Sequence, residues 1–121
     1  MPNKKILVTD DNAEIAAFIK IALESRGHTV TITRDPDDLL SRLPNEHPDL
    51  VIMDVMMPHK SGYDTLRELR THTATVPVLI MSGRPTVQNL FIGEDIQGFL
   101  IKPFSMEQLV EKVDEIFKTK S

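Results

Sequence analysis

Five polar side chains that could carry out chemistry each follow a short apolar run of this sequence. They are Asp10, Asp11, Asp54, Ser82 and Lys102. Because apolar runs of this length predict buried parallel strands, each of the five residues should stand at the carboxyl end of a strand. In an open α/β sheet these ends share one edge, where ligands bind. We therefore expect three carboxylates, one hydroxyl and one ammonium group to meet in a single crevice.

Such a crevice would hold an excess of negative charge. Three carboxylates and one ammonium leave it at roughly −2, and two like charges ~4 Å apart repel by about 4 kcal/mol at an effective dielectric near 20. A cation would relieve this repulsion, and a few hard oxygen ligands favour Mg²⁺. One carboxylate could then attack phosphorus while Lys102 and Ser82 stabilise the phosphoryl oxygens. The residues thus indicate a magnesium-dependent phosphoryl site.

Strand-like segments and segments of helical period alternate five times along the chain, which is typical of βα units. Strands are expected over residues 6–8, 29–33, 50–53, 78–81 and 99–101. The segment 29–33 alternates strictly between threonine and an apolar residue, which predicts an edge strand with one face partly in water. The apolar runs before Asp10 and Asp54 lack this alternation and are predicted to be buried on both faces.

Apolar residues at helical spacing predict the helices that connect these strands. In the first helix they are Ile15, Phe18, Ile19, Ala22 and Leu23. Asp11 and Glu14 resemble a capping box at the start of this helix, and Gly27 suits a left-handed stop at its end. The second helix should begin at Pro36 and the third after Gly62.

The last helix is expected to begin with a capping box formed by Ser105 and Gln108. Its buried stripe should comprise Met106, Leu109, Val110, Val113 and Phe117. Between Ser82 and Lys102, glycines and prolines interrupt the pattern, so only a short helix over 86–92 is predicted there.

Composition limits the classes of protein to which the chain can belong. The 121 residues are 40% hydrophobic and 26% charged, with a net charge of −4 and no cysteine. We expect one domain over residues 1–121, monomeric or weakly dimeric, without disulfides or thiolate metal sites. The negative charge does not favour binding to nucleic acid or an anionic membrane, and no apolar run approaches the ~18 residues of a membrane span. A cytoplasmic location is therefore expected.

The polar residues of the crevice stand in four separated motifs. These are Asp10-Asp11, Asp54-x-x-x-Pro58 followed by Gly62, Ser82-Gly83, and Lys102-Pro103-Phe104. In this order, and over essentially the whole chain, they resemble the receiver domain of two-component response regulators. The resemblance implies a flavodoxin-like α/β fold, a three-layer αβα sandwich of (βα)5 topology whose parallel five-stranded sheet has the order 2-1-3-4-5.

The resemblance also implies a reaction and the residues that support it. Asp54 would accept a phosphoryl group from the phosphohistidine of a sensor histidine kinase or a histidine phosphotransfer protein. Asp11, Asp54 and the backbone carbonyl of Met56 would bind Mg²⁺ directly, and Asp10 largely through water. Lys102 would hold the phosphoryl oxygens from a cis peptide bond with the proline that follows it.

A conformational switch is the output that the resemblance implies. Ser82 would move toward the phosphoryl group and also hold its oxygens, and Phe99 would fill the space that Ser82 vacates. The change would alter the binding of a downstream protein, without turnover of an external substrate.

Other interpretations of these residues remain open at this point. A phosphatase of the haloacid dehalogenase type uses similar acids, hydroxyls and lysines, although its nucleophile follows the first strand as D-x-D, where this chain has Asp10-Asp11. A receiver-like scaffold that is never phosphorylated is another alternative. Ser82 could cap a turn, and Phe99 could be an ordinary core residue. The four histidines share no ligand spacing, so exposed or turn positions are expected for them.

Overall fold

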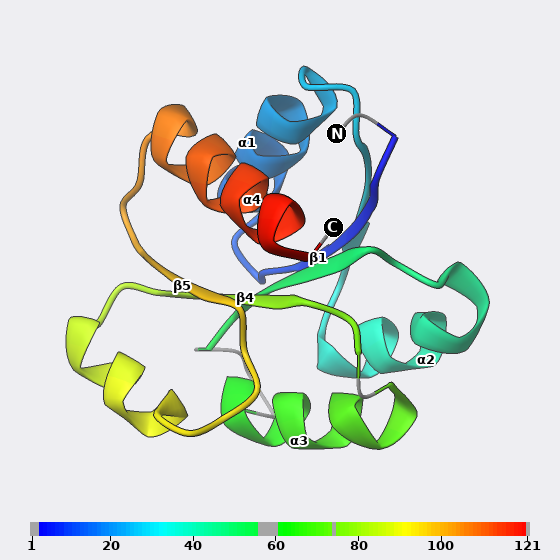
Figure 1. The fold of residues 1–121 in the computed structure, drawn as a ribbon, viewed down its shortest axis with the longest axis vertical. Helices are drawn as coiled ribbons and strands as arrows, with labels where there is room; N and C mark the ends of the chain where they lie inside the picture. Colours follow the sequence, from blue (N-terminus) through cyan, green and yellow to red (C-terminus); the bar gives the residue numbers. More distant parts are fainter. Residues whose placement is uncertain (1–2, 56–60, 74, 121) are drawn as a thin grey trace.

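The computed structural model describes residues 3–55, 61–73 and 75–120 (Figure 1). Its centre is a five-stranded parallel sheet with the order β2-β1-β3-β4-β5. The strands are β1 (Lys5–Thr9), β2 (Thr29–Thr33), β3 (Leu50–Asp54), β4 (Val78–Ser82) and β5 (Gly98–Ile101). This confirms the predicted flavodoxin-like α/β fold and its strand order. It also places side by side the four strands that lead to the candidate site residues.

Helices cover both faces of the sheet. The helical segments are α1 (Ala13–Glu24), α2 (Pro36–Glu46), α3 (Gly62–His72), the 3-10 helix η1 (Pro85–Phe91) and α4 (Met106–Lys120). Figure 1 shows α1 and α4 on one face, and α2, α3 and the yellow-green η1 on the other. The short helix predicted over 86–92 is therefore present, but as a 3-10 helix.

Each face of the sheet has its own hydrophobic core. Because side chains alternate along a strand, β1 sends Ile6 and Val8 to the core beneath α1 and α4, and Leu7 to the core beneath α2 and α3. The apolar residues 50–53 of β3 are all buried, as their unbroken pattern predicted, and Asp54 at its end is buried as well. The central strands are thus packed from both sides, and this packing supports the positions of their carboxyl ends.

The helix starts are partly as predicted. Helix α1 is capped by Asn12, whose Oδ1 accepts the amides of Glu14 at 3.0 Å and Ile15 at 3.2 Å, so the capping box expected from Asp11 is wrong. Asp11 precedes the cap and is exposed. In α4 the predicted reciprocal bonds between Ser105 and Gln108 are both present.

Burial departs from expectation at a few residues. Met106 is 42% exposed because it lies at the first turn of α4, before the helix reaches the sheet, and Ile116 joins the buried stripe instead. The strand β2 lies at the edge of the sheet as predicted, although Ile32 is exposed. His28 is buried against the ring of Phe117, contrary to the expected exposed or turn position. Among the described residues, no helix has the length and apolar character needed to cross a membrane.

Candidate functional site

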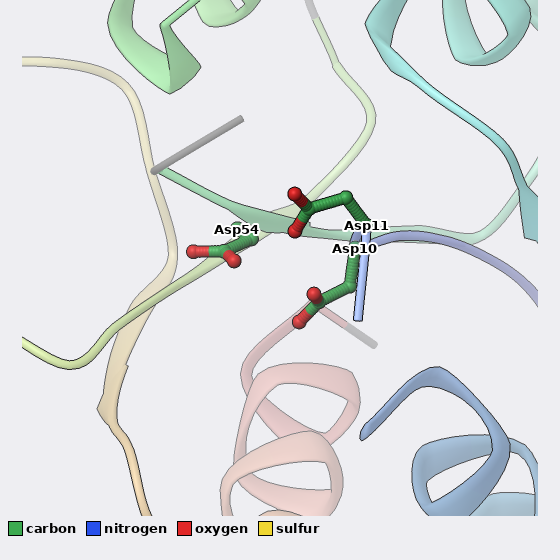
Figure 2. A group of neighbouring side chains, drawn as sticks. All are labelled: Asp10, Asp11 and Asp54. Atoms are coloured by element: carbon green, nitrogen blue, oxygen red, sulfur yellow. The ribbon is translucent and has the colours of Figure 1, made fainter. Parts of the chain in front are cut away.

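Three carboxylates from two neighbouring strands meet at the carboxyl edge of the sheet. Asp10 and Asp11 follow β1, and Asp54 is the last residue of β3. The parallel register pairs Thr9 with Met53, so Asp10 and Asp54 are the next residues on adjacent strands. One oxygen from each of the three side chains lies within 4.8 Å of the others, and Figure 2 shows the group. The clustering predicted from strand ends is therefore present, with Asp10 and Asp54 buried and Asp11 exposed.

Lys102 reaches this cluster from the end of β5. Its Nζ lies 2.7 Å from Asp10 Oδ2 and 2.8 Å from Asp54 Oδ2, so one ammonium bridges the two buried carboxylates. Burial acts to lower the pKa of Lys102, but the hydrogen bonds and charges of Asp10 and Asp54 outweigh it and hold this pKa above its usual value. Lys102 is therefore a stable cation in the site. The peptide bond between Lys102 and Pro103 is cis, as expected.

The loop between β1 and α1 fixes the second oxygen of Asp10. Asp10 Oδ1 accepts the amide of Asn12 at 2.8 Å, while the side chain of Asn12 caps α1. Asp10 is thus held from both sides, by Asn12 and by Lys102. The sequence reasoning missed this role of Asn12, although an asparagine before a helical pattern is a common capping signal.

Helix α3 begins close against the end of β3. The amide of Gly62 donates to the carbonyl oxygen of Val55 at 2.9 Å. A Cβ at residue 62 would lie 2.7 Å from Val55 Cα and 3.3 Å from the carbonyl oxygen of Asp54. A glycine is therefore required for this approach, which supports the backbone at Asp54.

Ser82 and Phe99 occupy the places expected from the sequence, but each also makes a local contact. Ser82 is fully buried at the end of β4, and its Oγ accepts the amide of Arg84 at 3.0 Å, as in a turn cap. Phe99 is half-buried on β5, and its ring centroid lies 6.5 Å from that of Phe91. In these contacts Ser82 caps a turn and Phe99 packs against a neighbouring ring. Met56, expected to offer a carbonyl ligand, lies outside the described residues.

The donor set of the cluster suits a hard divalent cation. Its three carboxylates offer oxygen ligands only. The single positive charge of Lys102 leaves the carboxylates and the lysine together with a net charge of roughly −2. Oxygen ligands, small in number and open to water through the exposed Asp11, are compatible with Mg²⁺.

Comparison with known proteins identifies the family. The sequence model described as "Response regulator receiver domain" matches residues 6–114. The chain belongs to this family, and it is therefore a receiver domain of the two-component response regulators.

Its relatives include regulators about twice its length. The transcriptional regulatory protein CpxR of Klebsiella pneumoniae is 34% identical over 116 residues, which are 94% of this chain and 49% of CpxR. The probable transcriptional regulator ycf27 of Porphyridium aerugineum is 32% identical over 98% of this chain and 50% of its own length. The response regulator MprA of Mycobacterium sp. (strain KMS) is 30% identical over 97% of the chain and 52% of its own length. The chain thus spans about half the length of these curated relatives.

Solved structures agree on the fold. The receiver domain of the Francisella response regulator 1452 superposes with a TM-score of 0.89 at 31% identity, covering 98% of this chain and 100% of that one. A receiver domain protein from Clostridium thermocellum gives a TM-score of 0.85 at 31% identity, over 97% of this chain and 96% of that one. The chemotaxis protein CheY4 of Vibrio cholerae, 24% identical with a TM-score of 0.88 over 94% of this chain and 98% of its own, shares the fold.

Proposed function

We propose that this receiver domain accepts a phosphoryl group on Asp54, in the presence of Mg²⁺, from the phosphohistidine of a sensor histidine kinase or a histidine phosphotransfer protein. The observation that carries the proposal is the position of Asp54. Its carboxylate is 2.8 Å from the Lys102 ammonium and shares the strand edge with two further carboxylates.

The transfer requires little covalent chemistry from the protein. An oxygen of Asp54 forms a bond to phosphorus while the phosphorus–nitrogen bond of the donor breaks, and the imidazole nitrogen leaves with the electron pair. The remaining requirements are alignment and stabilisation of charge on the phosphoryl oxygens. The Lys102 ammonium, already beside Asp54 Oδ2, is placed to pair with those oxygens.

Asp10, Asp11 and Asp54 are the residues that would hold Mg²⁺, together with the backbone carbonyl of Met56. When bound, the metal would offset the carboxylate charge and polarise a phosphoryl oxygen as a Lewis acid. Asp10 already accepts hydrogen bonds on both oxygens, from Asn12 and Lys102, which favours indirect contact with the metal through water.

Ser82 and Phe99 are the proposed switch. To reach a phosphoryl oxygen, the Ser82 hydroxyl would exchange its bond with the Arg84 amide for one with the new group. Phe99 would then move into the space that becomes available. Such a change needs two packings that differ by only a few kcal/mol, which the new charge-assisted hydrogen bonds can bias.

The proposed output is altered binding of a downstream protein by a single domain over residues 1–121. Turnover of an external substrate is not expected, since the domain would only phosphorylate its own Asp54 and slowly lose that phosphoryl group by autodephosphorylation. The net charge of −4 does not favour direct contact of this domain with nucleic acid.

Intact-mass measurement after incubation with acetyl phosphate and Mg²⁺ tests the proposal. The chain should gain one phosphoryl group, and Asp54→Asn should gain none while keeping its circular dichroism spectrum. Asp49→Asn is the matched control, because Asp49 precedes β3 at the opposite edge of the sheet and should not affect uptake. Uptake by Asp54→Asn would place the acceptor elsewhere, and steady turnover of a phosphate monoester would favour a phosphatase.

A further inference from the structure

We propose that Tyr63 on α3 senses the state of the phosphorylation site through a row of three aromatic rings. This aromatic row consists of Phe99, Phe91 and Tyr63. The inference rests on the proposed function and adds a site at which the signal reaches the surface, on the side of η1 that contacts α3.

The three rings of the aromatic row are in sequential contact. The centroids of Phe99 and Phe91 are 6.5 Å apart, and those of Phe91 and Tyr63 are 6.0 Å apart, with tilted planes in both pairs. Both separations are within the range of about 4.5–7 Å in which aromatic pairs attract. Phe91 is only 3% exposed, so the middle ring is enclosed while the two outer rings are half-buried. Movement of Phe99 therefore changes the packing around Phe91.

The position of η1, which ends at Phe91, depends on the contacts made before and after it. As a 3-10 helix, η1 has weaker hydrogen bonds than an α-helix, and Arg84 before it makes no side-chain cap. At the start of η1, the backbone of Arg84 is bonded to the Ser82 hydroxyl. Of the proposed switch residues, Ser82 thus contacts the residue that precedes η1, and Phe99 contacts its last residue. A change at either one is transmitted to the whole segment.

The loop that follows η1 is hydrogen-bonded to α3. Tyr63 donates its hydroxyl to Glu94 Oε2 at 3.2 Å and accepts a bond from Arg67 Nη1 at 3.0 Å. Arg70 donates to the carbonyl oxygen of Asp95 at 2.6 Å. Figure 1 shows η1 and α3 next to each other on the same face of the sheet. Displacement of η1 must therefore alter the hydrogen bonds or the ring packing of Tyr63.

Tyr63 can be observed directly, because the chain has one tyrosine and no tryptophan. Its emission, and the quenching of this emission by acrylamide, depend on the hydrogen bonds and the exposure of its phenol. We expect both quantities to change when acetyl phosphate and Mg²⁺ phosphorylate the full chain, in proportion to the phosphorylated fraction measured by intact mass. In Asp54→Asn neither quantity should change.

Variants that interrupt the aromatic row provide the decisive comparison. Phe91→Leu should lose the phosphorylation-dependent change of Tyr63 emission while still gaining a phosphoryl group. Phe117→Leu is the matched control, since Phe117 is 4% exposed and lies in the core on the opposite face. It should keep the full response. Phe99→Leu interrupts the row at a half-buried ring and serves as the second variant if Phe91→Leu does not fold.

The outcomes separate this inference from the function on which it rests. Phosphorylation without any change in Tyr63 emission, or a full response in folded Phe91→Leu or Phe99→Leu, would overturn the inference alone. A chain that gains no phosphoryl group would overturn the proposed function and this inference with it.

Discussion

Replacing Gly62 with alanine tests whether the close approach of α3 to β3 positions Asp54. The new Cβ would lie 2.7 Å from Val55 Cα. Carbon atoms pack at about 3.5–4.0 Å, so the overlap is roughly 1 Å. Because the atom that it meets belongs to the backbone, rotation of a side chain cannot relieve the contact. Either the first turn of α3 or the end of β3 must move.

The expected cost follows from the usual range for overpacking. Inserted atoms in a packed region cost about 1–3 kcal/mol, and a backbone clash favours the upper half of that range. A domain of 121 residues has a free energy of unfolding of about 6–18 kcal/mol, so Gly62→Ala should still fold. Its Tm should fall by roughly 6–15 °C. Since a displacement of ~1 Å can cost about 100-fold in rate, phosphorylation by acetyl phosphate should slow by at least about tenfold.

Thermal unfolding and time-resolved intact-mass measurement check both parts of this prediction. Gly83→Ala is the matched control, because a Cβ there meets no heavy atom within 4 Å and the residue lies at the same edge of the sheet. It should keep its Tm or gain slightly, by about 0.4–1 kcal/mol of stability. If Gly62→Ala unfolds at the parent temperature and is phosphorylated at the parent rate, Gly62 does not position Asp54.

Two further predictions concern the charges of Lys102 and His28. Lys102→Ala leaves the buried carboxylates of Asp10 and Asp54 without their bridging ammonium, so the free energy of unfolding in a chelator should fall by about 3 kcal/mol. It should recover with Mg²⁺ more than in the parent, and an unchanged Tm in the chelator would contradict this. This variant should also be phosphorylated to some extent but show a weaker Tyr63 response. Burial lowers the pKa of His28 below 6.5, helped by the charges of Lys4 and Arg26 and opposed by that of Asp114. Below about pH 6.5 the unfolded chain therefore binds more protons than the folded one. The free energy of unfolding should therefore be retained above pH 6.5 and should decline as the pH falls below it. In denaturant titrations at several pH values, His28→Gln should flatten this profile. His72→Gln, at an exposed histidine, is the control and should leave the profile unchanged.

The gathering of the site residues at the carboxyl edge of the sheet could be predicted because each of them follows an apolar run or stands next to one that does. An apolar run ending in a polar residue is visible in the sequence, and the parallel topology brings such ends together whatever the loops do. The prediction that Asp11 caps α1 is wrong by one residue, because the cap is Asn12. Which of the two residues caps the helix depends on where the chain turns from β1 into α1, and the sequence pattern does not give this point. Met106 was misjudged because helical spacing gives the face of a helix but not the turn at which that helix first meets the sheet.

Other contacts leave no periodic signal in the sequence. His28 is buried because the chain turns at Gly27, which has a φ of 91°, and passes beneath Phe117 from the far end of the sequence. The contacts of η1 are of the same kind, since Phe91 meets Tyr63 and Phe99 from two different elements. Only the assembled fold can reveal pairs of this sort.

Backbone pairing and side-chain contacts thus determine the positions of different parts of the domain. The register of β1 and β3 fixes the relative positions of Asp10 and Asp54, and any sequence that forms this sheet will place two such residues together. The position of η1 depends instead on individual side-chain contacts, above all those of Phe91 and Tyr63. Substitutions there can alter how phosphorylation is read without disturbing the carboxylates. Under the proposed function, transfer of a partner from a relative of about 30% identity to this chain therefore has to be justified by the residues of η1 and α3 rather than by Asp54.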